Sequence, residues 1–313
     1  MPITLQPTDR RDFLRASLAF GALCFGPRAM RAADGKSPVD PNRFALFSDT
    51  HVWAKRDEQV REVNMAKNLQ QACREALAGE SRPSQVLVCG DCAYLTGEAD
   101  DYAVLVELLQ PLREAQVPVH LVLGNHDHRE RFRAALPSDA AGENAGESAG
   151  DKAGLAERHV TIVRAPRANW FLLDSLDVTN KTPGVLGDAQ RQWLARALDA
   201  HADRPAIVMV HHNLDERPTP SGLVDTPALL ELLLPRKHVK ALFDGHSHQW
   251  SVSQRDGLHL VNLPPTAYVF DKKLPSGWVD AKLADDRLTL QLHCLDAAHP
   301  RQGETHELRW RVG

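Results

Sequence analysis

Short apolar runs recur along the chain, and five of them lead directly into polar residues. Continuous apolar runs of this length are typical of strands that are buried on both faces of a sheet. Since the carboxyl ends of such strands meet in one crevice of an open α/β sheet, we expect the five polar segments to converge there. The five units, each an apolar run with its polar continuation, are 43–51, 85–91, 118–127, 206–213 and 239–248.

Apolar residues at helical spacing fill the intervals between these predicted strands. One stripe begins at Val60 and ends at Leu77, and similar stripes lie in 102–114 and 187–200. Apolar positions three and four residues apart predict amphipathic helices that pack on a sheet. Cys73 lies on the first stripe, where a small buried residue is the simplest interpretation.

The rest of the chain predicts two more strands and one insertion. Apolar runs at 258–261 and 288–292 are expected to complete a sheet. The segment 137–157 is acidic and rich in Gly, Ala and Ser, with almost no large apolar side chain, so we interpret it as a flexible, solvated insertion. The sequence contains no sign of a second domain boundary. We therefore expect one catalytic domain of the α/β class over 40–313.

The first 33 residues have the layout of an export signal. Arg10-Arg11 precedes Phe13-Leu14, and the apolar run that follows, 16–26, is too short to form a stable membrane span. Paired arginines ahead of such a run predict a twin-arginine signal peptide. We thus expect export through the twin-arginine machinery to the periplasm or exterior, with no stable membrane association after processing. An uncleaved anchor and lipidation at Cys24 are the alternatives.

Composition narrows the functional classes only slightly. The chain has 313 residues, of which 43% are hydrophobic and 25% are charged, as in ordinary globular proteins. A net charge of −4 does not indicate nucleic acid or an anionic membrane as a partner. Five cysteines are too few for a disulfide-stapled scaffold.

Cys89 and Cys92 form a C-x-x-C that could be a thiol redox pair or half of a zinc site. A redox thiol should be exposed, whereas the apolar neighbours of Cys89 predict that it is buried. A zinc–thiolate site would need a second cysteine pair, which Cys73 and Cys294 do not form. A disulfide between Cys89 and Cys92 remains open in an oxidising compartment.

The polar segments carry ligand-type residues in a fixed order. Each cluster alone is common in proteins, but their joint occurrence behind five predicted strands is not. In chain order they are D-x-H at Asp49 and His51, G-D at Asp91, G-N-H-D at Asn125, His126 and Asp127, H at His211, and G-H-x-H at His246 and His248. This order resembles the calcineurin-like metallophosphoesterases over about two thirds of the chain. The linking segment 173–194 is similar to the cyclic-nucleotide phosphodiesterase and purple-acid-phosphatase branch.

The resemblance implies a two-sheet β-sandwich flanked by helices, in four layers (αββα), and a site for two metal ions from the set Fe, Mn and Zn. It implies that Asp49, His51 and His248 bind one ion, that Asn125, His211 and His246 bind the other, and that Asp91 bridges them. A hydroxide shared by the ions would attack phosphorus in line. His126 would protonate the leaving group or stabilise the phosphate charge, and Asp127 would orient His126 or hold the turn.

Two positions leave alternatives open. His211 directly follows its strand, while His212 points the other way in an extended chain, so we favour His211 as the ligand. His212 and His128 remain possible pocket residues. Gly90-Asp91-x-x-Tyr94 also resembles the purple acid phosphatases, in which the tyrosine binds ferric iron. Those enzymes have glycine where this chain has His51, so we favour His51 as the ligand and Tyr94 as pocket wall or packing.

We therefore expect an exported, metal-dependent hydrolase of phosphate esters. The preferred substrates are small phosphodiesters or cyclic nucleotides, because D-x-H with G-N-H-D resembles that branch of the superfamily. Loops 215–227 and 264–271 are expected to supply the pocket walls. A phosphomonoesterase of the acid-phosphatase type and a catalytically silent metal-binding adaptor are the alternatives.

Overall fold

The computed structural model describes residues 4–5, 37–136, 155 and 158–312. The predicted signal peptide, 1–33, lies outside the described residues apart from the backbone of Thr4 and Leu5. The predicted insertion, 137–157, lies outside them apart from Leu155. Both remain predictions. Within the described part of the chain, every helix is too short or too polar to cross a bilayer.

The first sheet brings three parallel strands side by side. Its strand order is β1-β4-β3-β2-β11-β12-β13, in which β2, β3 and β4 are parallel and the other pairings are antiparallel. The register pairs Ser48 with Cys89 and Cys89 with Val122, so the carboxyl ends of the three parallel strands lie level. The strands are β1 (Thr4–Leu5), β2 (Val39–Ser48), β3 (Arg82–Cys89), β4 (Val119–Val122), β11 (Gly277–Leu283), β12 (Arg287–Cys294) and β13 (Thr305–Arg309).

The second sheet has six strands in the order β5-β6-β7-β8-β10-β9. Its four central strands run parallel, and the edge strands β5 and β9 are antiparallel to their neighbours. The predicted strands that end in His211 and in the G-H-x-H motif are therefore neighbours in this sheet. The strands are β5 (Thr161–Arg164), β6 (Asn169–Leu172), β7 (Ala206–Met209), β8 (Val239–Asp244), β9 (Ser251–Arg255) and β10 (Leu258–Asn262).

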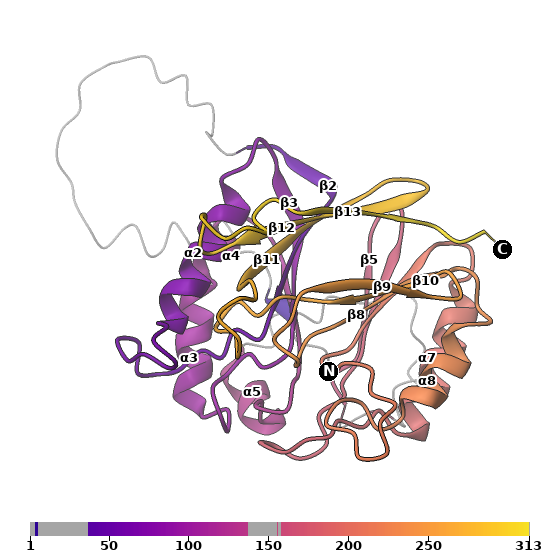
Figure 1. Ribbon diagram of the computed structural model, residues 1–313, viewed down its shortest axis with the longest axis horizontal. Coiled ribbons are helices and arrows are strands. Elements are labelled where there is room, and N and C mark those ends of the chain that lie inside the picture. The colour runs from indigo at the N-terminus through magenta and orange to yellow at the C-terminus, as the bar shows by residue number, and fades with distance from the viewer. Residues whose placement is uncertain (1–3, 6–36, 137–154, 156–157, 313) are drawn as a thin grey trace.

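The two sheets pack face to face, and helices cover their outer faces (Figure 1). Phe44 of the first sheet contacts Trp170 of the second with ring centroids 5.4 Å apart, in the core between the sheets. Successive side chains of a strand point to opposite faces of the sheet. Phe47 lies an odd number of positions after Phe44 in β2, and its side chain therefore packs against the helices. The four-layer αββα fold implied by the resemblance is confirmed.

Of the six helices in the described part of the chain, five lie in two outer layers. α2 (Met65–Leu77), α3 (Ala99–Leu108) and α4 (Gln110–Glu114) cover the first sheet, whereas α7 (Asp188–Ala200) and α8 (Thr226–Leu233) cover the second. The short α5 (Arg129–Ala135) follows the G-N-H-D turn and packs on α3. Cys73 is buried in α2, as the sequence predicts.

The predicted helix boundaries needed two corrections. α2 begins only at Met65, because Asn64 caps it by accepting a hydrogen bond from the Lys67 amide, and Val60 and Val63 pair in a small bridge before it. The predicted helix 102–114 is divided at Leu109 into α3 and α4, with Pro111 in the first turn of α4.

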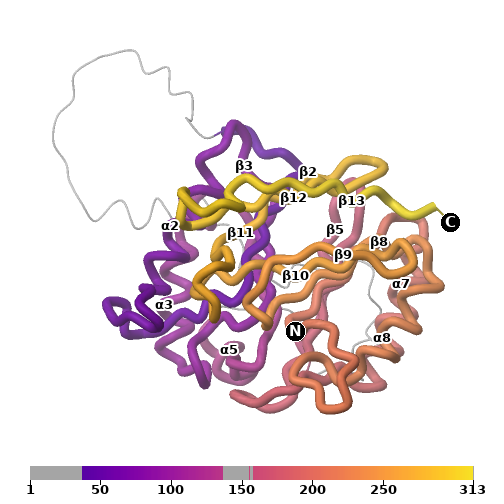
Figure 2. Tube along the Cα trace, viewed as in Figure 1, coloured from indigo at the N-terminus to yellow at the C-terminus, as the bar shows by residue number. Residues whose placement is uncertain are grey.

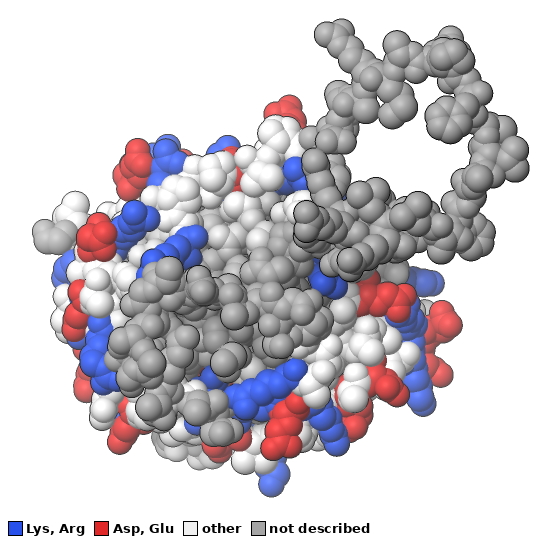
Figure 3. Space-filling model, turned by 180° about the vertical axis from the view of Figure 1, so that it is seen from behind, with Lys and Arg blue, Asp and Glu red and all other residues white. Residues whose placement is uncertain are grey.

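The C-terminal strands return to the start of the fold. Figure 2 shows β11 to β13, in gold and yellow, on the same side of the molecule as the indigo strand β2, and the register pairs Val279 of β11 with Leu46 of β2. On the face drawn in Figure 3, the described lysine and arginine side chains are interspersed with aspartate and glutamate, in keeping with the small net charge.

Candidate metal centre

A cavity of about 620 Å³ opens where the carboxyl ends of the parallel strands of both sheets meet. The structure thus brings together segments that are far apart in the sequence, as the strand pattern predicts. Six of the predicted site residues line this cavity: His51, Asp91, Asn125, His126, His246 and His248.

Left-handed backbone conformations recur among the predicted ligands. Five of the predicted ligands have φ angles between 42° and 64°, a region that residues other than glycine seldom adopt. Such conformations persist where the surrounding structure enforces them, and they cluster at functional sites. The five residues are Asp49, His51, Asp91, His246 and His248.

Two motif glycines are required by close packing at the site. A Cβ atom on Gly90, whose φ is +73°, would lie 2.4 Å from His211 Nδ1. A Cβ atom on Gly124 would lie 2.1 Å from Asp91 Oδ1. Because neither position has room for a side chain, these glycines let the strand ends approach Asp91 and His211 closely.

The first group of ligand-type atoms contains Asp49, His51 and His248. His248 Nε2 lies 3.4 Å from Asp49 Oδ1 and 3.1 Å from His51 Nε2. Asp49 is oriented by its other oxygen, Oδ2, which accepts hydrogen bonds from Ser48 Oγ (2.5 Å) and the His246 amide (3.2 Å). Asp49 Oδ1 is therefore left facing the two imidazoles.

The second group contains Asp91, His211 and His246. His211 Nε2 lies 3.3 Å from Asp91 Oδ1, and His211 Nδ1 is 2.8 Å from the carbonyl oxygen of Cys89. His246 Nε2 is 3.1 Å from the carbonyl oxygen of Ser221. A carbonyl can only accept, so each ring donates one N–H outward and directs its other nitrogen towards the cluster.

Asp91 lies between the two groups. Its Oδ2 is 3.7 Å from His51 Nε2, while its Oδ1 faces His211 and accepts a hydrogen bond of 2.8 Å from the His126 amide. Each carboxylate oxygen thus faces a different histidine. A carboxylate in this position can contact ions on both sides at once, which one imidazole cannot do.

Burial and mutual contact shift the pKa values of these groups. Burial alone would raise the pKa of Asp91, but His211 holds it well below its usual range. Burial would lower the pKa of His211, and the Asp91 carboxylate raises it well above the ordinary value. Burial lowers the pKa of His51 to about 3 and that of His246 to about 4, so both rings are neutral near pH 7, the form that binds metal.

Unpaired buried atoms indicate that this cluster fits cations. Asp49 Oδ1, Asn125 Oδ1 and His211 Nε2 are buried without a hydrogen-bond partner, although buried polar atoms are normally paired. Among the described residues, both groups place one ligand atom per residue within 4.8 Å of the others. Carboxylate, imidazole and amide donors in this mixture suit first-row divalent metals. The residues present therefore fit the metal ions that the resemblance implies.

His126 and Asp127 have different surroundings. His126 lines the cavity, and its Nδ1 is 2.7 Å from the carbonyl oxygen of Leu95, which leaves Nε2 free for a ligand. Asp127 is fully buried behind the cavity. Its carboxylate accepts hydrogen bonds from the amides of Cys92, Ala93 and Gly124 and from the Tyr102 hydroxyl. Asp127 was predicted either to orient His126 or to hold the turn. These hydrogen bonds support the second role.

Tyr94, His128 and His212, the three possible pocket residues, do not line the cavity. Tyr94 packs on Trp53, with ring centroids 5.2 Å apart, and is not in any ligand group found among the described residues. The buried His212 ring has its Nδ1 2.8 Å from Ser175 Oγ. The ligand groups found among the described residues contain His51 and His211 and none of these three neighbours.

The C-x-x-C has no redox geometry. Cys89 and Cys92 are free thiols and are completely buried. Burial raises the pKa of Cys89 to about 11 and that of Cys92 well above its ordinary value, whereas a reactive thiol needs a lowered pKa and access to solvent. The loop contributes instead through Asp91 and through the carbonyl oxygen of Cys89.

Both loops predicted as pocket walls contribute to the cavity, but the sequence did not assign roles within them. Asp215 accepts hydrogen bonds from the amides of Ser221 (2.9 Å) and Gly222 (3.1 Å) and thereby fixes the loop whose carbonyl orients His246. Tyr268 and Phe270 form an aromatic wall beside His248. Tyr268 and Phe270 lie at the end of an irregular loop, where no hydrophobic periodicity could have predicted their place in the cavity wall.

Comparison with known proteins agrees with this geometry. A family model described as calcineurin-like phosphoesterase matches residues 42–250. The chain belongs to the calcineurin-like phosphoesterase family. As a member of this family it is a phosphoric ester hydrolase.

Several relatives of this phosphoesterase carry curated names. The 3′,5′-cyclic adenosine monophosphate phosphodiesterase CpdA of Pseudomonas aeruginosa is 30% identical over 254 residues, which are 79% of this chain and 84% of that protein. A probable cyclic nucleotide phosphodiesterase of Psychrobacter arcticus is 25% identical over 77% of this chain and 88% of that protein. A dimetal phosphatase of Danio rerio shares the fold, with a TM-score of 0.63 and 17% identity over 87% of this chain and all of that one.

Proposed function

We propose that this phosphoesterase is a dinuclear-metal phosphodiesterase that acts on small phosphodiesters, with cyclic nucleotides as the foremost class. The observation that carries the proposal is the position of Asp91, whose two oxygens face His51 on one side and His211 on the other. The names of the relatives from Pseudomonas and Psychrobacter support the substrate class.

Seven side chains would hold the two ions, for which Fe, Mn and Zn are the candidate metals. When bound, the ions would polarise the phosphoryl oxygens and supply a nucleophile derived from water for in-line attack. We assign Asp49, His51 and His248 to one ion, Asn125, His211 and His246 to the other, and Asp91 to both.

His126 is the residue that we propose as the general acid. With its Nδ1 hydrogen directed to the carbonyl oxygen of Leu95, Nε2 is the nitrogen that can carry a transferable proton into the cavity. The protonated ring would donate this proton to the leaving oxygen as the phosphorus–oxygen bond breaks. Asp127 would act only by positioning, since it joins the loops that carry Asp91 and His126.

A substrate panel with metal removal tests this function. We expect that treatment with a chelator abolishes hydrolysis and that added Mn²⁺ restores it, because the proposed reaction needs the cations that these carboxylate, imidazole and amide groups would hold. After reconstitution, bis(4-nitrophenyl) phosphate and 3′,5′-cyclic AMP should be hydrolysed with a kcat/KM at least about tenfold above that for 4-nitrophenyl phosphate.

The alternatives give different results in the same panel. A preference for 4-nitrophenyl phosphate would identify a phosphomonoesterase. Bound metal without hydrolysis of any of the three esters would favour the silent adaptor. Full activity in the chelated, metal-free protein would contradict the metal site itself.

We also propose that the enzyme is exported by the twin-arginine route, on the basis of Arg10-Arg11 and the apolar run behind them. Replacing both arginines with lysine should leave the full-length precursor in the cytoplasm, since the paired arginines are the signal that the machinery recognises. Cell fractionation with immunoblotting measures this. An unchanged distribution between compartments would show that this signal is not used.

A further inference from the structure

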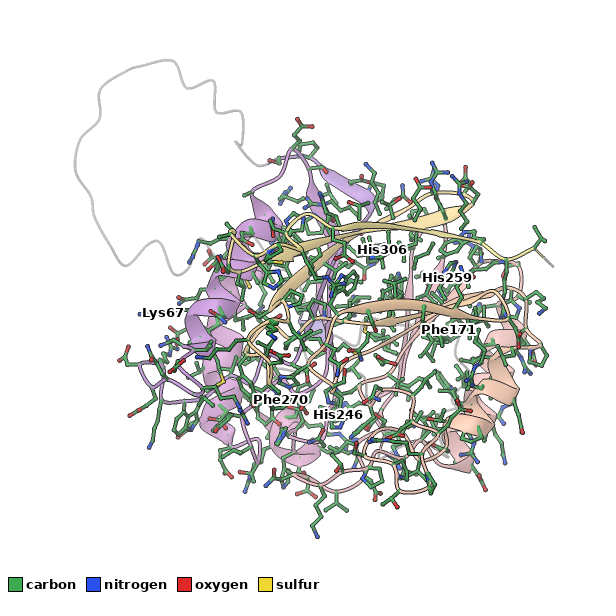
Figure 4. All side chains as sticks on the ribbon, in the orientation of Figure 1. Lys67, Phe171, His246, His259, Phe270 and His306 are labelled. Atoms are coloured by element: carbon green, nitrogen blue, oxygen red, sulfur yellow. The ribbon has the colours of Figure 1, made fainter. Side chains whose placement is uncertain are left out.

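One wall of the metal cavity presents an aromatic side chain to solvent. Phe270 is 58% exposed, although large apolar side chains are usually buried, and it lines the cavity next to the predicted metal ligands. Its ring centroid lies 4.4 Å from that of His248. In Figure 4, Phe270 and His246 lie at the same end of the molecule, in loops beyond the strand ends.

Neighbouring groups hold this ring in place. The guanidinium of Arg61 lies 4.9 Å from the centroid of Phe270 and 5.7 Å from that of Tyr268, within the range of cation–π contact. Tyr268 is itself fixed, because it stacks on His51 and its carbonyl oxygen is 2.6 Å from His248 Nδ1. Phe270 is therefore exposed at a position defined by its neighbours.

The same ring extends the cavity away from the metal groups. Phe270 also borders a second cavity of about 290 Å³, which Arg61, Val63 and Leu274 help to line. A phosphate bound at the ligand groups would thus have its ester substituent beside Phe270, with space beyond it. A free phosphate would leave this wall uncovered.

Another part of the cavity lining has a different chemistry. It is formed by the loop that contains Asn213, Glu216 and Ser221, whose side chains are polar. A ligand that matches both parts of the lining has a planar apolar face and also polar groups. Aromatic rings and guanidinium groups both stack on nucleobases and aryl rings.

We propose that Phe270, supported by Arg61, binds the planar aryl or heteroaromatic group of the phosphodiester substrate. This inference rests on the proposed phosphodiesterase function and specifies its substrate class. Diesters with a planar ring near phosphorus are preferred over diesters that have only aliphatic substituents.

The test compares two substrates that share the reacting phosphodiester. They are 3′,5′-cyclic AMP and the 3′,5′-cyclic phosphate of 1-O-methylribose, in which a methoxy group replaces the base. In Phe270→Ala, the ratio of kcat/KM for the nucleotide to kcat/KM for the base-free diester should fall about tenfold, the effect typical of one lost base–aromatic stack. Phe270→Trp should keep the ratio within about threefold, because tryptophan also stacks.

Two further variants complete the comparison. Arg61→Ala should lower the same ratio in the same direction, although less than Phe270→Ala does. Val39→Ala removes another exposed apolar side chain, at the opposite end of strand β2 from the ligands, and should not change the ratio. Metal content is measured for each variant, because Phe270 touches the ring of His248.

The outcomes separate this inference from the proposed function. An unchanged ratio in Phe270→Ala with normal metal content would overturn the aromatic subsite and leave the phosphodiesterase intact. An equal loss for both substrates together with loss of metal would show that Phe270 acts through His248 and would also overturn it. If the metal-loaded wild type hydrolyses neither diester, the proposed function fails and the inference fails with it.

Discussion

Asp91→Asn should lower kcat/KM by about a thousandfold or more, because stabilisation of the transition state by two bound ions is worth several kcal/mol. The amide is nearly the same size as the carboxylate but has no charge and only one oxygen. The NH₂ group of the new asparagine would face either His51 or His211. An oxygen with a free lone pair is needed at that place to bind a cation. We expect metal content, measured on the purified protein, to fall together with turnover.

The matched control for this variant is Asp285→Asn. The Asp285 side chain is 89% exposed and pairs with Arg167 on the surface, so its loss should leave turnover and metal content unchanged within error. Circular dichroism establishes that both variants are folded. Full metal content with full turnover in Asp91→Asn would contradict the assignment of this residue as the bridge.

His126→Ala should lower kcat for cyclic AMP by roughly 10²–10⁴, the range for loss of a general acid. Metal content should stay at the wild-type level, since the proposed ligand sets are complete without His126. The loss should be much smaller for bis(4-nitrophenyl) phosphate, whose leaving group needs little protonation. The measurement is steady-state kcat for both substrates over a range of pH, together with metal analysis.

Metal analysis also separates the two possible roles of His126. His126, His51 and Asp91 form a third group of ligand-type atoms within 4.8 Å of one another. Loss of one ion in His126→Ala, with equal losses of activity for both substrates, would identify His126 as a ligand rather than an acid. His201→Ala, at the end of α7 and outside the cavity lining, is the control and should keep both properties.

The convergence of the candidate site residues was predictable from sequence, because the proposed ligands follow strands whose apolar runs are continuous. The run before Asp91 and the run before His211 each identify a strand, and parallel strands place their carboxyl ends together. The choice of His211 over His212 followed from the alternation of side chains in an extended chain. In the structure, His211 faces Asp91 and His212 faces Ser175.

Features that depend on distant parts of the chain were not predictable in this way. The sequence left Asp127 with two roles, and the contact with Tyr102 and with two amides of the Asp91 loop supports only one of them. Strand β11 was not predicted from the sequence. It is paired with β2, near the other end of the catalytic domain, and local periodicity does not report such a distant pairing. The exposed ring of Phe270 lies in an irregular loop, where periodicity carries no information.

The central claim is that Asp91 lies between two metal ions. The most direct test is a crystal structure of the Mn²⁺-loaded protein with anomalous difference maps. Two peaks roughly 3.5–4 Å apart, both coordinated by Asp91, are the predicted result. A single peak, or two peaks of which one does not contact Asp91, would contradict the account.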